Sequence, residues 1–199
     1  MSKRWSLPAR GYSLMELLTV LAILSTIVTI TVPAFASHRR RTALRAASAE
    51  IRAAFHLTRS RAIARNVNCA MKFVLLAGEW HYAVYEDGDG DGVRNDDIAK
   101  GKDPLVERPR ILFPESRIVT AGLLPETIRD PDGDPLPPSK SPIAFNSSTL
   151  CSFSPAGEAT PGTIYLTDRG RDLYAIRVYG ATAKIRVLRY DRLKRKWGV

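Results

Sequence analysis

The stretch GYSLMELLTVLAILSTIVTITVPAF, residues 11–35, decides the fold class, because it has the length and composition of a membrane helix. No charged residue stands from Leu17 to Phe35, and a run of about nineteen uncharged residues is just long enough to span a bilayer. A short basic leader precedes the stretch, and the basic segment SHRRR (37–41) follows it. Its one acid, Glu16, would cost about 2.5–3.5 kcal/mol at the bilayer centre and less near an interface, so its presence needs a reason.

The length of the chain is sufficient for this anchor and one compact domain with its own core. The chain has 199 residues, a formal charge of +10 and a pI near 9.9. Such a charge permits contact with nucleic acid, anionic lipid or an acidic protein, and it is also compatible with a basic, solvated surface. The sequence contains no dinucleotide-binding, Walker, HExxH or Ser/His/Asp pattern, and its three histidines have no ligand spacing. We therefore expect a protein that is not an enzyme and requires no cofactor.

The segment around the glycine resembles the type IV prepilin class, in which a basic leader ends in Gly, Glu follows four residues after the first mature residue, and a long apolar helix begins. The resemblance implies that a prepilin peptidase cuts between Gly11 and Tyr12 and N-methylates Tyr12. The new α-amino group of one subunit then pairs with Glu16 of a neighbour in a filament. Pro33, an expected assembly residue, stands where such helices often carry a proline, which removes one backbone hydrogen bond and should kink or locally loosen the helix.

Two alternatives to this interpretation stay open at the N-terminus. Glu16 can simply extend its carboxylate to the lipid headgroups. In addition, VPAFAS (32–37) imitates the small-residue cleavage site of a conventional secretory signal, which would make the chain a secreted protein, even a secreted enzyme.

After Pro33 the pattern becomes amphipathic. Apolar residues recur at spacings of about three and four, which predicts one buried helix face: Leu44, Ala47, Ile51, Phe55, Ala62 and Ile63. Eight arginines stand between Arg39 and Arg65, with Glu50 as the only acid. We expect one helix over residues 12–66, whose first half lies in the membrane or filament core. The arginines nearest Pro33 fit the headgroup region or neighbouring subunits.

The rest of the chain has the composition of β-strands separated by clusters of Gly, Pro, Asp and Ser. Strands are predicted at 69–76, 80–85, 107–113, 142–147, 162–167, 174–179 and 183–190, with a loop over 129–142. The fold class is therefore α+β, with a long helix packed on an antiparallel sheet. The expected segments are a leader (1–11), a transmembrane or filament-core helix (12–36), its amphipathic continuation (37–66) and a β-rich domain (67–199).

Three segments of this domain resemble the GspH/FimT family of pseudopilins. They are LTRSRAIARNVNCAMKF (57–73), FSPAGEA (153–159) with the following GTIYLT strand, and IRVYGATAKIRVLRYD (176–191). The Arg that often follows the hairpin glycine in this family is missing after Gly180. The resemblance implies a pilin-like fold and a minor subunit of a type II secretion or type IV pilus-like filament. It places the helix in the bacterial inner membrane as a single pass and the domain in the periplasm, with other pilins or pseudopilins as partners.

The segment EDGDGDGVRNDD (86–97) predicts a loop that binds a hard cation such as Ca²⁺. Its oxygen ligands would follow the alternating positions of an EF-hand loop: Asp87, Asp89, Asp91, the Val93 carbonyl and, through water, Asn95. The closing bidentate Glu is absent, since Ile98 stands there. The alternative is an acidic, solvated hairpin loop, because Asp and Gly form turns without any ion.

The C-terminus is a basic tail with interleaved aromatic residues. Its cations are Lys184, Arg186, Arg189, Arg192, Lys194, Arg195 and Lys196. A flexible end of this kind can neutralise phosphates while Trp197 stacks on a base, and some FimT-type minor pilins bind DNA during natural transformation. The alternatives are a charged edge strand and a tail near anionic headgroups.

The two cysteines, Cys69 and Cys151, lie far apart and have no metal-type spacing. An exported domain permits a disulfide between them, and two separately buried thiols are the equally open alternative.

Overall fold

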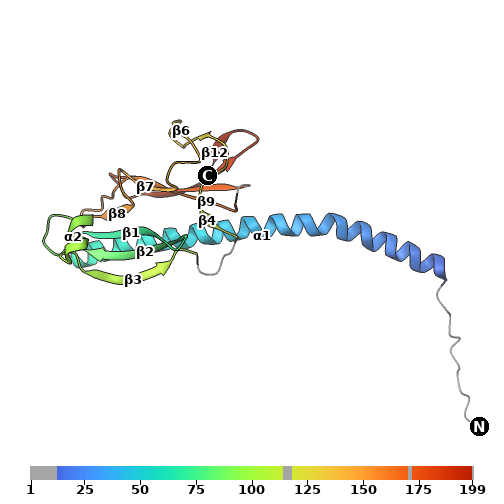
Figure 1. The fold of residues 1–199 in the computed structure, drawn as a ribbon, viewed down its shortest axis with the longest axis horizontal. Coiled ribbons are helices and arrows are strands. Elements are labelled where there is room, and N and C mark those ends of the chain that lie inside the picture. The colour runs from blue at the N-terminus through green and yellow to red at the C-terminus, as the bar shows by residue number, and fades with distance from the viewer. Residues whose placement is uncertain (1–12, 114–117, 170–171, 199) are drawn as a thin grey trace, which may run out of the picture. The chain divides into compact units, whose positions relative to one another are not determined.

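The computed structural model describes residues 13–113, 118–169 and 172–198, with the backbone alone at 33, 34, 36 and 37. The N-terminal part of the described chain forms one helix, α1 (Leu14–Arg65; Figure 1). The single long helix predicted over residues 12–66 is thus confirmed over its described length. The structure divides into two compact units between Arg39 and Arg40, and the second unit contains all the strands.

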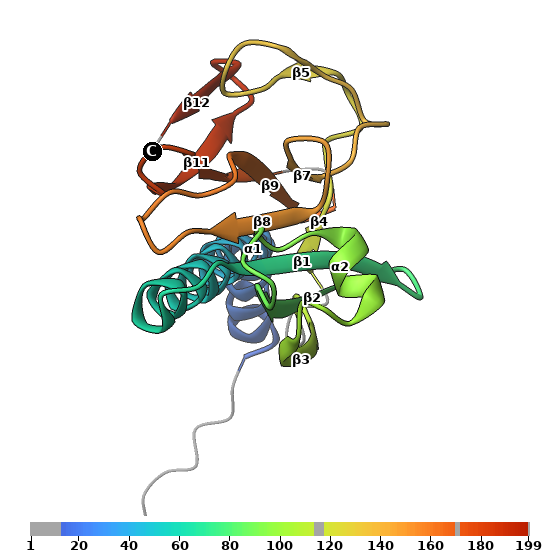
Figure 2. The same cartoon turned by 90° about the vertical axis from the view of Figure 1, so that its left-hand side faces the viewer.

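The second unit holds two antiparallel sheets, which form separate layers (Figure 2). The first sheet has the order β3 (Leu105–Ile111), β2 (Glu79–Glu86), β1 (Cys69–Leu76) and β8 (Leu150–Phe153). The second has the order β12 (Lys196–Gly198), β11 (Ile185–Asp191), β10 (Leu173–Val178), β9 (Gly162–Thr167) and β4 (Thr120–Ala121), and β7 (Ile143–Phe145) also pairs with β9. A short helix, α2 (Asn95–Lys100), and the two-stranded ribbon of β5 (Ile128–Arg129) and β6 (Pro135–Leu136) complete the unit.

The main core lies between α1 and the two sheets. The predicted apolar face of α1 is buried, with one exception: Ile63 keeps 51% of its surface exposed, whereas Ala62 keeps none. The reason is geometric, because successive residues turn about 100° around a helix, which carries Ile63 away from the buried stripe. Strand residues such as Ile164 and Ile176 close the same core from the second sheet.

Phe55 joins all three layers of this core. Its ring centroid lies 6.1 Å from that of Phe73 on β1 and 5.9 Å from those of Phe145 on β7 and Phe153 on β8. Edge-on and tilted contacts at this separation are favourable beyond the area they bury. One helix residue therefore fixes the position of both sheets against α1.

Both sheets are also covered on part of their outer faces. Ile128 and Leu136, on β5 and β6, pack with Tyr165 and Leu173 of the second sheet. The loop expected over 129–142 is thus wrong in detail, because it contains one strand of a covering ribbon too short to show a period. The burial of both faces fits the uncharged centres of these strands, residues 164–166 of β9 and 173–176 of β10.

Candidate functional site

The described anchor segment runs from Leu14 to Val32 and has a mean hydropathy of 2.1, with no part of it buried. Among the described residues it is the one helix long and apolar enough to cross a membrane. Gly11 and Tyr12, the predicted cleavage and methylation site, lie outside the described residues. Pro33 lies within α1, which continues beyond it for about nine turns.

Glu16 lies in the first turn of α1 and is exposed. A carboxylate there is favourable, because the N-terminus of a helix carries partial positive charge. Other polar side chains of the segment are already satisfied: the hydroxyls of Ser25 and Thr26 donate to the carbonyls of Leu21 and Ala22 at 2.8 and 2.9 Å. Hydroxyls bonded in this way add little cost to a helix in lipid.

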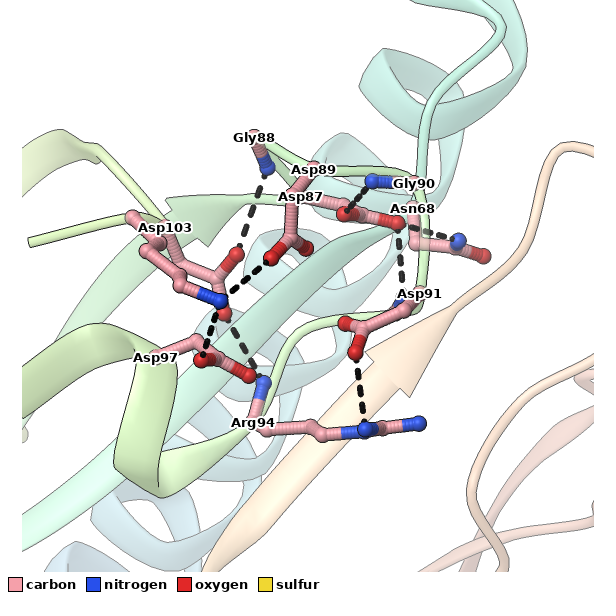
Figure 3. A network of polar contacts seen from close by, with 11 residues as sticks. Asn68, Asp87, Gly88, Asp89, Gly90, Asp91, Arg94, Asp97 and Asp103 are labelled. Carbon is pink, nitrogen blue, oxygen red and sulfur yellow. Dashed lines mark hydrogen bonds and ion pairs between the residues drawn. The ribbon is translucent and has the colours of Figure 1, made fainter. Parts of the chain in front are cut away.

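The predicted cation loop follows β2, and Asp87 organises it (Figure 3). One carboxylate oxygen of Asp87 accepts a hydrogen bond from the Gly90 amide at 2.7 Å. The other accepts from the Gly92 amide and the Asn68 side chain, both at 2.8 Å. Partial desolvation would raise the pKa of Asp87, but these hydrogen bonds outweigh it and lower the pKa below its usual value.

The other two acids of the loop are bound by cations of the chain itself. Lys102 Nζ lies 3.0 Å from Asp89 Oδ2 and also 3.4 Å from an oxygen of Asp97, while Arg94 Nη1 lies 2.8 Å from Asp91 Oδ2. The Lys102 hydrogen bond lowers the pKa of Asp89. Partial desolvation and the neighbouring Asp89 raise the pKa of Asp91. Figure 3 shows the Asp91 carboxylate facing the side chain of Arg94, separately from the contacts of Asp89 and Asp97.

Sequence reasoning missed the buried acid that closes the loop. Asp103 is 2% exposed, and its carboxylate accepts hydrogen bonds from the amides of Gly88 at 3.2 Å and Arg94 at 2.9 Å. Backbone amides in an irregular segment have no strand or helix partner, and here the Asp103 carboxylate accepts the hydrogen bonds of two of them. Nothing in the local pattern around Asp103 indicates this role, because its partners stand nine to fifteen residues earlier.

The structure brings the three carboxylates of the predicted calcium loop together, with one oxygen from each within 4.8 Å of the others. The other two predicted ligands, the Val93 carbonyl and Asn95, stay predictions. Val93 has a buried side chain, and Asn95 begins α2. Calcium binding stays a prediction, and in this structure the positive charges that face Asp89 and Asp91 come from Lys102 and Arg94.

The C-terminal tail folds back on the sheet, so the flexible end expected from the sequence is wrong. β12 pairs with β11, which places Trp197 opposite Tyr190 with their ring centroids 5.2 Å apart. Trp197 Nε1 donates to the carbonyl oxygen of Arg129 at 2.9 Å. The turn forms because the Asp191 carboxylate accepts the amides of two of the next three residues. Trp197 is thus engaged by its own domain.

Two of the basic residues of this region have acidic partners within the chain. Arg189 binds Asp172 at 3.2 Å, and Arg192 binds Glu126 at 2.7 Å. The exposed cations are Lys184, Arg186, Arg192, Lys194, Arg195 and Lys196. Glu126 and three arginines also line a cavity of about 720 Å³ beside β5 and β6. Its mixed charge does not select an anion.

The two cysteines are buried free thiols, so the disulfide alternative is not what the structure forms. They lie on the neighbouring strands β1 and β8, but Cys69 is opposite Phe153 and Cys151 is opposite Met71. This diagonal offset sets Cα atoms about 7–8 Å apart, beyond the reach of an undistorted disulfide. Burial raises the pKa of Cys69 to about 11 and also raises that of Cys151.

Arginines of α1 anchor the helix to the sheets through acids that sequence reasoning did not single out. Arg40 lies 3.9 Å from the buried Asp168, and Arg41 lies 3.8 Å from Asp172. Arg61 donates to Glu86 at 2.6 Å. Arg40 and Arg41 are among the arginines nearest Pro33, and the structure gives both of them acidic partners within the domain. Contact of this group with headgroups or neighbouring subunits stays a prediction.

A long apolar anchor followed by a helix packed on two antiparallel sheets is the architecture of a pilin-like subunit. The model of one family, type II transport protein GspH, matches residues 47–182, and the chain belongs to this family of pseudopilins. The comparisons with curated proteins and with solved structures gave no match. Members of the GspH family are structural subunits rather than catalysts, and the chain accordingly has a type II secretion pseudopilin-like role, with one apolar anchor helix in the described part of the chain.

Proposed function

We propose that this chain is a minor pseudopilin, a structural subunit of a type II secretion or type IV pilus-like filament. In this proposal prepilin peptidase cuts the chain between Gly11 and Tyr12 and methylates Tyr12. The apolar part of α1 holds the protein in the bacterial inner membrane, with the β-rich unit in the periplasm. The family match over residues 47–182 carries the proposal, and the anchor segment supports it independently of that match.

Glu16 would drive assembly through charge. Cleavage creates a positive α-amino group on Tyr12, and Glu16 lies exposed in the first turn of α1. In lipid the carboxylate is costly, and pairing with the amine of a neighbouring subunit would relieve that cost only in the filament. The same residue would therefore favour the assembled state over the free subunit and would set the register between helices.

The processing step is tested by the mature N-terminus. The full chain would be produced in cells with and without a prepilin peptidase and analysed by intact mass and N-terminal fragmentation. N-methylated Tyr12, lost on Gly11→Val and in cells without the peptidase, is the expected result. A mature chain that begins at Ser37 would show conventional signal cleavage and refute the proposal.

The assembly step is tested by Glu16→Gln, which keeps the side-chain shape and removes its charge. Cleavage should be unaffected, whereas cross-linking to neighbouring subunits in filaments should fall by about tenfold or more, the effect of leaving a charge unpaired in a buried pair. Ser25→Ala is the matched control on the same helix, because its hydroxyl bonds only within α1. Equal cross-linking in Glu16→Gln would refute the pairing.

A FimT-like role in DNA uptake is the alternative function, and it rests on the basic tail. Salt-dependent titration of duplex DNA against the full chain tests it, since phosphate contacts weaken steeply with salt. Binding that is lost on neutralising Lys194, Arg195 and Lys196 would favour this alternative over a purely secretory filament.

A further inference from the structure

One face of α1 in the second unit points away from both sheets. Its residues repeat at helical spacing and leave the buried stripe on the opposite side. We call it the outer α1 face and define it by Arg45, Ala49, Arg52, Ala53, Leu57 and Arg59. Leu57 keeps 62% of its surface exposed there. Together with the exposed Ala49 and Ala53, which lie at successive turns before it, Leu57 forms a contiguous apolar strip, and such a strip is typical of a surface that meets a partner.

Three arginines of this face are spaced by seven residues, so they form one stripe along the helix. Arg45 and Arg52 are exposed, and Arg59 is half-buried beside the turn at Gly157. None of the three forms an ion pair with a described residue, and Arg59 Nε is buried without a hydrogen-bond partner there. The arginines of α1 on either side of the stripe, such as Arg41 and Arg61, do have acidic partners.

Small residues run beside the arginine stripe. Ala49 and Ala53 are exposed and lie one turn apart, with Leu57 one turn further along the helix. A ridge of alanines allows a second helix to approach closely, towards the lower end of the 8–10 Å range of interaxial distances. Arginines beside such a ridge correspond to the charged positions that flank the apolar seam of a coiled coil. In a coiled coil these charges determine which helix can pair.

We propose that the outer α1 face docks an acidic helix of a different subunit, which presents Asp or Glu at heptad spacing to Arg45, Arg52 and Arg59. This inference rests on the proposed pseudopilin function and names the chemistry of one filament partner. The apolar ridge supplies the contact area, and the unpaired arginines supply the selectivity.

A second copy of this chain does not fit the face. From Arg40 to Arg65 the only acid of α1 is Glu50, which already interacts within the chain and lines a small cavity with Tyr82 and Leu112. Two copies would therefore bring arginines together without compensating acids. Nucleic acid would satisfy the arginines, but phosphates offer no apolar surface to Leu57 or to the alanine ridge.

The test uses the full chain in zwitterionic detergent and a synthetic helical probe. The probe is an Ala/Leu-rich peptide of about four heptads with one Glu in each heptad, and its partner probe carries Lys instead. The Glu peptide should bind the wild-type chain, and Arg45→Glu/Arg52→Glu/Arg59→Glu should weaken it by about tenfold or more. The Lys peptide should bind the reversed variant in its place.

Two further variants separate docking from general attraction. Arg108→Glu/Lys140→Glu/Lys194→Glu makes the same change in net charge on exposed residues elsewhere, and it should bind the Glu peptide nearly as the wild type does. Ala53→Arg adds positive charge but blocks the ridge, so docking predicts weaker binding and mere electrostatics predicts tighter binding. Thermal melts of each variant show that the fold is kept.

Several outcomes would overturn the inference. One is an equal loss of Glu-peptide affinity in the two triple variants, and another is tighter binding of the Glu peptide by Ala53→Arg. A third is a homodimer that cross-links through Ala49→Cys. The fourth is an arginine stripe that binds duplex DNA but not the Glu peptide. A chain that is cleaved and assembles normally, yet fails these tests, refutes only the docking surface. A chain that is not cleaved at Gly11 refutes the proposed function, whatever the peptide does.

Discussion

Phe55→Ala should destabilise the second unit strongly, whereas Leu57→Ala, two residues further along the same helix, should hardly affect it. Phe55 has no exposed surface, and its ring contacts three other rings from both sheets. Removing a buried Phe costs about 3–5 kcal/mol, and the lost aromatic contacts place this case towards the upper end. Leu57 is 62% exposed, so its truncation should cost less than about 0.5 kcal/mol.

Urea unfolding of the full chain in detergent measures the difference, with the fluorescence of Trp80 and Trp197 reporting on the second unit. For a unit of this size the loss at Phe55 corresponds to a fall in melting temperature of about 6–20 °C. Phe55→Leu is the matched control and should cost about 1–2 kcal/mol, because most of the volume is kept. Equal effects at Phe55 and Leu57 would refute the assigned rotation of α1 and, with it, the outer α1 face.

The other predictions concern the loop, the thiols and the tail. Asp87→Asn should lower the free energy of unfolding mainly above pH 4. The folded-state pKa of Asp87 is lowered, so its carboxylate stabilises the fold above the unfolded pKa of about 3.9, and that stabilisation is lost as the pH falls through the folded pKa. If the unfolding free energies of wild type and variant change in parallel with pH, this prediction is wrong. If the loop binds Ca²⁺, added CaCl₂ should raise the melting temperature of the wild type but not of Asp89→Asn. Cys69 and Cys151 should resist iodoacetamide at pH 8 until the chain is unfolded, as mass spectrometry would show, since both are buried with raised pKa values. Trp197→Ala should lower stability by about 1–2 kcal/mol by denaturant titration, whereas a free tail would show no change.

Local physics determined the parts of this protein that the sequence predicted well. The anchor and the continuation of α1 follow from uncharged length and from apolar spacing, and both depend only on residues within a few turns of one another. The β1, β2, β9 and β10 strands were visible for the same reason, since each has a run of strand-forming residues. The clustering of Asp87, Asp89 and Asp91 is likewise local, being set by alternate residues in one turn.

Only the tertiary structure decided which charges are neutralised and which remain free. Arg41 and Arg45 look alike in the sequence, but Arg41 meets Asp172 from the far end of the chain and Arg45 meets no described acid. Lys102 reaches Asp89 across thirteen residues, and Trp197 reaches the carbonyl of Arg129 across sixty-eight. Such pairings depend on where the sheets bring distant segments together, and no local pattern encodes that distance. The anchor could therefore be predicted from its own residues, whereas the outer α1 face became visible only once the internal partners of the other arginines were known.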